Sequence, residues 1–190
     1  MKILIFEGIA TSGKTVIIDR LIKALPRTRI KVIDESKSHL PINTKLNNTH
    51  IDFFKKLVTK AVDEALKDQD SLLVFDRLYL TQAFRAKAKI NDYAKIEEIL
   101  LPFSPITVLL KVDEDLIGTR VVRAIEHRDP KWGEYVRAKG KTMNESADYY
   151  IDQQRALQKL LEQSLIPHKV FDTSDHNYAE IVGKIVEFTR

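Results

Sequence analysis

Short apolar runs alternate with longer segments of mixed polarity from one end of the chain to the other. The apolar runs are strand-sized, and their polarity does not alternate from one residue to the next, which is typical of strands covered on both faces of a sheet. We predict five such strands, at Lys2–Glu7, Ile30–Asp34, Ser71–Asp76, Ile106–Val112 and Lys169–Asp172.

Between these runs the apolar residues recur at the spacing of amphipathic helices. The predicted helices are Thr15–Ala24, Ile51–Lys67, Thr81–Leu100 with a break near Asn91, Asp115–His127, Lys141–Gln163 and Tyr178–Thr189. Because strands and helices alternate throughout, we predict a doubly wound α/β domain with a five-stranded parallel sheet and helices on both faces. Ligands of such folds bind beyond the carboxyl ends of the strands.

Composition predicts one domain without membrane spans. The 190 residues, 44% of them hydrophobic, suffice for a single well-packed domain over residues 1–190. No apolar stretch approaches the roughly 20 residues of a membrane span, and the apolar run before Glu7 is too short for a signal peptide. The chain has no cysteine, which excludes disulfides and thiolate metal sites and suits a cytoplasmic protein.

The charge pattern limits the expected partners. Lys and Arg outnumber Asp and Glu by only 31 to 27, a net charge of +4, and no basic run with interleaved aromatic residues occurs. This balance favours a locally basic phosphate site over a nucleic-acid surface. The five histidines show no paired ligand spacing, which argues against a protein-bound transition metal. Nothing in the pattern decides between a monomer and a homodimer.

The segment Gly8–Thr15 reads Gly-Ile-Ala-Thr-Ser-Gly-Lys-Thr and fits the phosphate-binding P-loop pattern G-x-x-x-x-G-K-[ST]. It lies between a predicted strand and a predicted helix, as this loop requires. The glycines let successive backbone N–H groups point at phosphate oxygens, Lys14 can reach the terminal phosphates, and the Thr15 hydroxyl can ligate Mg²⁺. We therefore expect a nucleoside triphosphate with Mg²⁺, bound by Gly8, Ala10, Thr11, Ser12, Gly13, Lys14, Thr15 and Val16.

Four of the five predicted strands end in acidic residues, namely Glu7, Asp34–Glu35, Asp76 and Asp172. Because the carboxyl ends of parallel strands share one edge of a sheet, these carboxylates are expected to converge on the rim that holds the P-loop. Each could instead cap the helix that follows it. Asp76 is the strongest candidate for holding Mg²⁺ or its water, and Arg77 beside it can grip a phosphate or pair with a carboxylate.

Two short segments carry a family resemblance. Phe6-Glu7-Gly8 ahead of the P-loop and Asp76-Arg77-Leu78-Tyr79 at the end of the third strand resemble the thymidylate kinase group and the related deoxynucleoside kinases. The resemblance implies a strand order of 2-3-1-4-5, ATP as phosphoryl donor, and an acceptor site over the third strand. It also implies that Arg77 contacts the acceptor and that Asp76 belongs to the magnesium environment. After the second strand only Glu35 matches the family pattern, and Lys37–His50 is predicted to be a polar surface loop at the acceptor.

The same resemblance implies a lid over about residues 115–140. Arg120 and Arg123 fall on one helix face there, where small P-loop kinases bring arginines over the transferring phosphate. The alternative for both is a solvated helix with ion pairs. The stretch Arg128–Gly133 is predicted to be a loop at the lid tip.

Two further positions have two interpretations each. Thr173 follows the fifth strand, where related kinases border adenine, but a signal for the start of the next helix explains it nearly as well. Phe84 either packs in the helix core or stacks on the acceptor.

The function predicted from these patterns is an ATP-dependent phosphotransferase with Lys14, Glu35, Asp76, Arg77, Arg120 and Arg123 as catalytic candidates. The thymidylate kinase resemblance favours a nucleoside monophosphate as acceptor, and a nucleoside or other small hydroxyl compound is the alternative. Glu35 suits a hydroxyl acceptor, because a hydroxyl must lose a proton and a monophosphate need not. A nucleotide-hydrolysing switch is the second alternative, but the guanine-recognition pattern N-K-x-D is absent.

Overall fold

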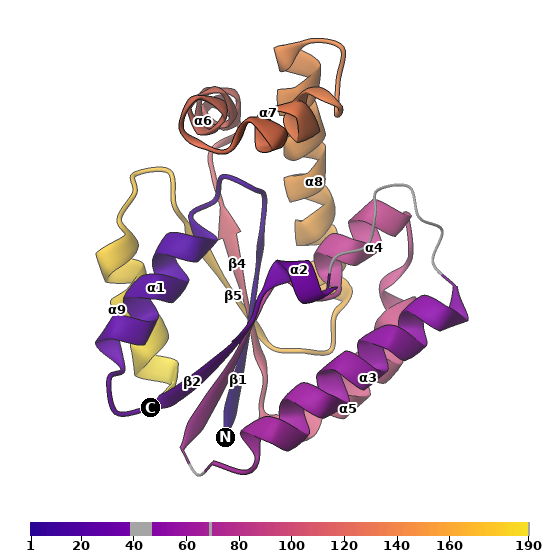
Figure 1. The fold of residues 1–190 in the computed structure, drawn as a ribbon, viewed down its shortest axis with the longest axis vertical. Coiled ribbons are helices and arrows are strands. Elements are labelled where there is room, and N and C mark those ends of the chain that lie inside the picture. The colour runs from indigo at the N-terminus through magenta and orange to yellow at the C-terminus, as the bar shows by residue number, and fades with distance from the viewer. Residues whose placement is uncertain (39–46, 69, 190) are drawn as a thin grey trace.

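A computed structural model describes residues 1–38, 47–68 and 70–189, and its centre is a parallel sheet in the order β2-β3-β1-β4-β5 (Figure 1). The strands are β1 Lys2–Gly8, β2 Arg29–Ile33, β3 Ser71–Asp76, β4 Ile106–Lys111 and β5 His168–Asp172. Every strand boundary lies within one residue of its prediction, and the predicted strand order is confirmed. Parallel pairing brings the carboxyl ends of all five strands to one edge.

Side chains of successive strand residues leave the sheet on opposite faces, and in the three central strands β3, β1 and β4 both faces are buried. In β1, Ile3 and Ile5 join one apolar cluster, whereas Leu4 and Phe6 join another, and all four are at most 1% exposed. This two-sided burial explains why the strands read as continuous apolar runs. Helices α1 (Lys14–Ala24) and α9 (Tyr178–Thr189) cover the face of Leu4 and Phe6, and the two helices pack side by side.

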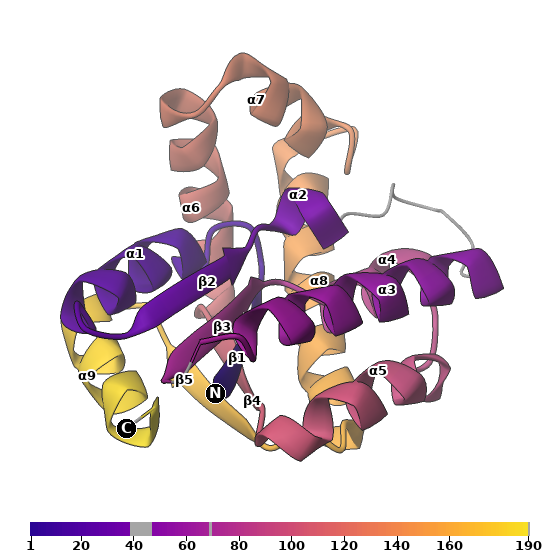
Figure 2. The same cartoon turned by 60° about the horizontal axis from the view of Figure 1, so that its bottom comes forward.

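The opposite face is covered by four helices, which are seen together in Figure 2. They are α3 (Asn48–Ala65), α4 (Leu80–Ala86), α5 (Ala94–Leu100) and α8 (Met143–Gln163). Short 3₁₀ turns at Ile90–Tyr93 and Leu101–Phe103 flank α5. Within the described ranges, none of these or the other helices combines the length and the apolar character that crossing a membrane requires.

Two helices project beyond the carboxyl edge of the sheet, α6 (Glu114–His127) and α7 (Pro130–Arg137) (Figures 1 and 2). They pack on the upper part of α8 around a third apolar cluster that includes Ile9 of the P-loop. The prediction of a loop over Arg128–Gly133 is therefore wrong. A helix begins at Pro130 because the Asp129 side chain accepts a hydrogen bond from Lys131 N at 2.8 Å and proline fits the first helical position.

The predicted break near Asn91 is confirmed, and one other boundary needs correction. The helix expected over Thr81–Leu100 is interrupted as expected: α4 ends at Ala86, because Lys87 adopts a left-handed conformation with φ of 50°, and α5 begins at Ala94 after the 3₁₀ turn at Ile90–Tyr93. The polar loop expected over Lys37–His50 is shorter, since α2 occupies Glu35–Ser38 and α3 begins at Asn48 after the Asn47 cap. Residues 39–46 of that predicted loop lie outside the described residues.

Candidate active site

The P-loop has the backbone that its sequence predicts. Gly8 and Gly13 adopt φ of 143° and 85°, in the region that side chains disfavour. Lys14 begins α1 and turns back over the loop, where its Nζ donates to the carbonyl oxygens of Gly8 at 2.9 Å and Ile9 at 2.7 Å. Burial, together with a smaller contribution from the neighbouring Arg77 charge, lowers the pKa of Lys14 to about 7. Ser12 is buried and donates to Ile9 O at 3.0 Å, so its side chain serves the loop itself.

Gly8 tolerates no side chain. A Cβ at this position would lie 2.5 Å from Leu110 O, a backbone atom of the neighbouring strand. We expect Gly8→Ala to destabilise the protein by about 1–3 kcal/mol or to displace the loop and weaken nucleotide binding. Gly183→Ala is the matched control, because a Cβ there meets nothing within 4 Å in α9 and should stabilise the fold by about 0.5–1 kcal/mol. Urea unfolding of both variants tests this, and a Gly8→Ala variant as stable as the wild type, with unchanged nucleotide binding, would contradict it.

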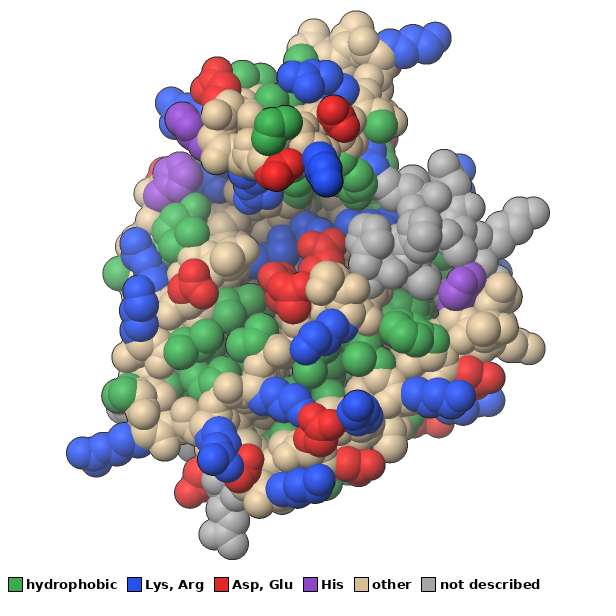
Figure 3. All heavy atoms as spheres, viewed as in Figure 1, with side chains coloured by type: hydrophobic (Ala, Val, Ile, Leu, Met, Phe, Trp, Pro, Cys, Tyr) green, Lys and Arg blue, Asp and Glu red, His purple; other side chains and the backbone are tan. Residues whose placement is uncertain are grey.

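A cleft of about 610 Å³ opens beside the P-loop, between the carboxyl edge of the sheet and the projecting helices. In Figure 3 it appears as a hollow beneath α6 and α7 with acidic and basic side chains at its floor. Ala10, Gly13, Lys14, Thr15 and Val16 form its P-loop side. Its other lining residues are Asp34, Glu35, Ser36, Asp76, Arg77, Arg85, Arg128, Trp132, Tyr135, Tyr150 and Gln153. Two of the four strand ends with acidic residues, Asp34–Glu35 and Asp76, thus line this cleft, whereas Glu7 and Asp172 do not.

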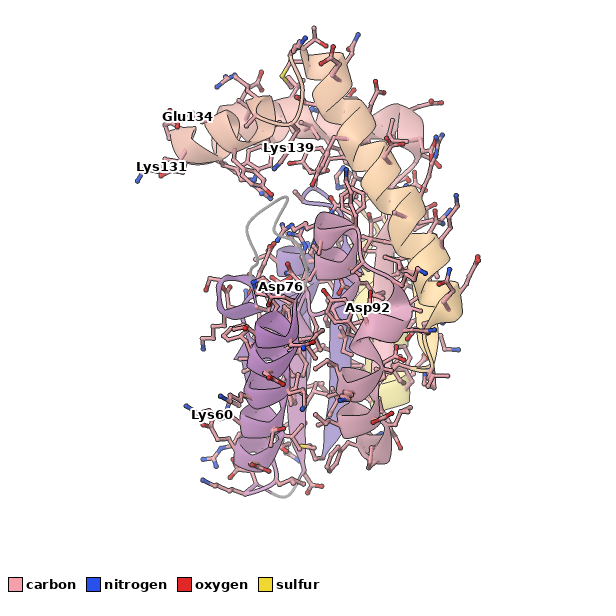
Figure 4. The ribbon with its side chains drawn as sticks, turned by 90° about the vertical axis from the view of Figure 1, so that its right-hand side faces the viewer. Lys60, Asp76, Asp92, Lys131, Glu134 and Lys139 are labelled. Atoms are coloured by element: carbon pink, nitrogen blue, oxygen red, sulfur yellow. The ribbon has the colours of Figure 1, made fainter. Side chains whose placement is uncertain are left out.

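Asp76 and Thr15 fit a magnesium site of the P-loop type. Both line the cleft, and Figure 4 shows Asp76 at the edge of the sheet beneath α7. Asp76 Oδ1 is buried and has no hydrogen-bond partner among the described residues. Burial raises the pKa of Asp76 and Lys14 opposes that rise, so the carboxylate lies where a cation would stabilise its charge. No cluster of three or more His, Asp or Glu suited to a metal occurs in the described ranges, but Mg²⁺ with a bound triphosphate needs only one or two protein ligands.

Glu35 lies at the centre of a charged cluster that lines the cleft. Its Oε1 accepts from Arg77 Nη1 and, at 2.9 Å, from Arg85 Nη2. Both arginines are at most 6% exposed. Burial alone would raise the pKa of Glu35, but the two guanidinium groups outweigh it and lower the pKa to about 2. Glu35 is therefore an ionised carboxylate, held in one orientation by two buried cations.

The predicted lid arginines lie in different places. Arg120 is 9% exposed and donates to backbone carbonyls on two sides, Thr11 O at 3.3 Å in the P-loop and Ser174 O at 2.9 Å after β5. Arg123 is exposed, and neither residue lines the cleft. Arg128 does line it, donates to Ala10 O at 3.3 Å and stacks its guanidinium 4.7 Å from the centre of the Trp132 ring.

Two positions with open interpretations are now located. Thr173 is buried, its hydroxyl donates to Lys111 O at 2.9 Å, and its carbonyl accepts from Arg120, so its polar groups hold the end of β5. The Phe84 ring makes an edge contact with Tyr149 at 5.5 Å between centroids and does not line the cleft.

Sequence reasoning missed the wall that α7 and α8 contribute. Tyr135, Tyr150 and Gln153 line the cleft, and the Tyr150 hydroxyl is buried with no hydrogen-bond partner among the described residues. Tyr135 lies near the arginine cluster, with its hydroxyl 3.5 Å from Arg85 Nη2. The three-residue spacing of Tyr150 and Gln153 on a predicted helix was the available signal, because it places both on one helix face.

No protein-family model matches this chain, and a search of curated proteins finds no match. Solved structures do share its fold. The YorR protein of Bacillus subtilis, in complex with phosphorylated GDP, superposes with a TM-score of 0.62 at 18% identity over 98% of this chain and 94% of that one. Shikimate kinase of Acinetobacter baumannii, in complex with shikimate, gives a TM-score of 0.54 at 19% identity over 98% and 91% of the two chains.

Deoxyadenosine kinase of M. mycoides with bound dATP gives a TM-score of 0.54 at 16% identity over 98% of this chain and all of that one. At these identities the likeness shows the fold and not the substrate. The chain therefore has the P-loop kinase fold, with its five-stranded sheet in the order 2-3-1-4-5.

Proposed function

We propose that this protein is a kinase that moves the γ-phosphoryl group of Mg-ATP to a hydroxyl group of a small acceptor, with a nucleoside as the first candidate. The P-loop with its buried Lys14 supports the donor half of this assignment. The cleft beside the loop supports the acceptor half, because its volume suits a small molecule next to the triphosphate. Neighbours in fold space that bind nucleotides, deoxyadenosine kinase among them, support both halves by analogy.

The pairing of Glu35 with Arg77 and Arg85 is the observation that favours a hydroxyl acceptor. A monophosphate acceptor is best bound by arginines that are not already paired with a carboxylate. Both Arg77 and Arg85, however, form ion pairs with Glu35. Repulsion between Glu35 and an acceptor phosphate 4 Å away would be about 4 kcal/mol per unit charge at an effective dielectric constant of 20, which offsets part of the attraction that Arg77 and Arg85 would otherwise give that phosphate. The resemblance to thymidylate kinases favours a monophosphate, and Arg77 suits either acceptor, so Glu35 decides our choice.

The proposed reaction is an in-line displacement at the γ-phosphorus. The acceptor hydroxyl oxygen forms the new P–O bond, the bond from phosphorus to the bridging oxygen of ADP breaks, and ADP leaves with the electron pair. The hydroxyl proton passes to the Glu35 carboxylate and then to water. A carboxylate with a low pKa suffices, because the transition state is loose and the hydroxyl loses its proton late. Glu35 mainly orients the hydroxyl, and Arg77 and Arg85 fix Glu35.

The reaction also requires that the negative charge on the transferring phosphoryl group be neutralised. Lys14 and the P-loop N–H groups would hold the phosphates, and Arg128 is the lid-segment arginine that lines the cleft. Mg²⁺, held by the Thr15 hydroxyl and Asp76 directly or through water, would neutralise charge on the β- and γ-phosphates. Arg120 and Arg123 could act there only if α6 moved, so we assign Arg120 to holding the P-loop against the loop after β5. Thr173 stays a proposed neighbour of the donor base through this same loop.

An acceptor screen tests the function. ADP release from Mg-ATP would be measured over a panel of nucleosides, their monophosphates and other small hydroxyl compounds, with product masses read by chromatography. The proposal expects ADP release that depends on a hydroxyl compound and a product heavier by one phosphoryl group. Release that depends only on monophosphates would replace it with the thymidylate kinase-like alternative, and release without any acceptor would favour a nucleotide-hydrolysing switch.

Nucleotide binding should take up protons above neutral pH. In the ligand-free protein the pKa of Lys14 is lowered to about 7, so at pH 8 about nine-tenths of this side chain is neutral. A bound triphosphate favours the charged ammonium and raises that pKa, so binding at pH 8 should take up nearly one proton, whereas at pH 6 Lys14 is already charged and contributes none.

Isothermal titration calorimetry in buffers of different ionisation enthalpy measures this uptake. Lys14→Arg is the control, because a guanidinium stays charged throughout the range. A binding enthalpy at pH 8 that is the same in every buffer would show that Lys14 is not neutral in the unliganded protein.

A further inference from the structure

Glu7 is a fully buried carboxylate in β1 that does not line the cleft. It is the last residue before the first P-loop glycine, yet its side chain turns toward the neighbouring strand β3 and not toward the loop. Its Oε1 accepts from the backbone N–H groups of Leu78 at 3.0 Å and Leu80 at 3.2 Å. Its Oε2 accepts from the Thr81 hydroxyl at 2.5 Å. A buried carboxylate with three donors holds those donors firmly, because losing it would leave buried N–H groups unsatisfied.

The turn that Glu7 holds is the turn that carries Arg77. Arg77 has φ of 61°, a left-handed conformation that costs energy for a residue with a side chain. Its own N–H donates to Phe6 O at 2.9 Å, so β1 fixes one side of this residue through the backbone and the other side through the Glu7 carboxylate. The surroundings thus impose on Arg77 a backbone that it would not adopt alone.

Arg77 in turn holds Glu35, the residue that faces the acceptor in the proposed function. Arg77 Nη1 donates to Glu35 Oε1, and the Arg77 carbonyl accepts from the Ser38 hydroxyl of α2 at 3.3 Å. A chain of direct contacts therefore runs from Glu7 in β1, through the turn that carries Arg77, to the Glu35 carboxylate.

We infer that Glu7 is a positioning residue for the acceptor side: its carboxylate fixes the turn at residues 77–80 so that Arg77 meets Glu35. Because Glu7 directly precedes the P-loop, its place in the sequence suggests a role in nucleotide binding. Its hydrogen bonds instead predict a role on the acceptor side. Loss of the Glu7 carboxylate should disturb Arg77 and the acceptor step and leave Mg-ATP binding nearly intact. The inference rests on the proposed function only for the identity of the acceptor.

Four variants separate this role from a general loss of stability. Glu7→Leu removes all three acceptor contacts, and Thr81→Val removes only the contact to Oε2. Glu7→Gln keeps an oxygen for the two backbone donors and an amide that can donate to the Thr81 hydroxyl. Asp172→Leu is the matched control, because Asp172 also ends a strand and accepts from the following turn, at 2.9 Å from Ser174 N, but does not line the cleft.

The Nε–Hε resonance of Arg77, assigned with Arg77→Lys, reports the turn without any acceptor. We expect it to shift or broaden strongly in Glu7→Leu, to change in the same direction but less in Thr81→Val, and to stay in place in Glu7→Gln and Asp172→Leu. Mg-ATP affinity should change by less than about threefold in all four variants, and kcat with the acceptor should fall at least about a hundredfold in Glu7→Leu and recover in Glu7→Gln.

An unchanged Arg77 resonance in Glu7→Leu would overturn the inference, and if that variant does not fold, an unchanged resonance in Thr81→Val does so. Mg-ATP binding that weakens as much as the acceptor step would also overturn it. If the resonance responds as expected but no hydroxyl compound is phosphorylated by the wild type, the positioning role of Glu7 stands and the proposed function alone fails.

Discussion

Lys14→Ala should lower phosphoryl transfer at least about a thousandfold, a loss of about 4 kcal/mol of transition-state stabilisation. The Lys14 ammonium is only 6% exposed and turns over the P-loop, where the terminal phosphates of a bound triphosphate would lie. In such a buried position a charge acts on the transferring group with little screening by water. Single-turnover transfer from saturating Mg-ATP measures the loss directly, because saturation removes the contribution of weaker binding.

The fold should survive this substitution. Among the described residues, the hydrogen bonds of Lys14 Nζ go to P-loop atoms, namely Gly8 O, Ile9 O and Ser12 Oγ, and Lys14 begins a helix, in which alanine is favoured. Circular dichroism should therefore show an unchanged helix content and a cooperative transition. ATP-dependent transfer at the wild-type rate in Lys14→Ala would remove the P-loop from the mechanism.

Glu35→Gln should have the second-largest effect, a fall in kcat of about a hundredfold to ten-thousandfold with the KM for ATP little changed. The amide has nearly the shape of the carboxylate and keeps an oxygen for Arg77 and Arg85, but it cannot take the proton of an acceptor hydroxyl. It also leaves two buried guanidinium groups without their counter-charge. Steady-state kinetics with the acceptor found in the screen measure both parameters.

Asp34→Asn is the matched control for Glu35→Gln. Asp34 is the adjacent carboxylate on the same rim, but its Oδ1 accepts from Ser36 N at 2.8 Å, a contact within its own turn. We expect this change to lower kcat by less than about tenfold. If the two variants lose activity equally, Glu35 has no special part in the reaction, and a monophosphate acceptor, which needs no base, becomes the better interpretation.

The fold could be predicted from the sequence because burial on both faces leaves a plain signal. Ile3 and Leu4 point to opposite sides of the sheet and both meet helices, so the strand is apolar at every position. The P-loop could be predicted because its backbone needs glycine at two fixed positions. Two short helices were not predicted, because α2 has four residues and α7 has eight, too few for a helical period to stand out.

Several residues of the site could be predicted from the sequence, but the contacts between them could not. Strand topology brings Glu35, Asp76 and Arg77 to one rim, which the sequence indicates. Arg85 joins them from α4, fifty residues from Glu35, and no local pattern reports that contact. The lid arginines show the same limit, because spacing places Arg120 on a helix face but only the packing of α6 decides what that face meets.

The acid at the end of β1 illustrates a further limit. Glu7 and Asp76 look alike in sequence, each an acidic residue that ends an apolar strand. In the structure one carboxylate has three donors and the other has a buried oxygen without a partner among the described residues. The hydrogen-bond count, together with the position of Asp76 in the cleft lining, separates a carboxylate that holds a turn from one that could bind a cation.

The most direct test of the central claim follows the labelled γ-phosphate of ATP. The wild-type protein is incubated with γ-labelled Mg-ATP and a pool of nucleosides or, separately, a pool of nucleoside monophosphates, and the labelled products are identified. We predict a labelled phosphate monoester from the nucleoside pool, absent with Lys14→Ala and strongly reduced with Glu35→Gln. Label only in nucleoside diphosphates, or only in inorganic phosphate, would contradict transfer to a hydroxyl group.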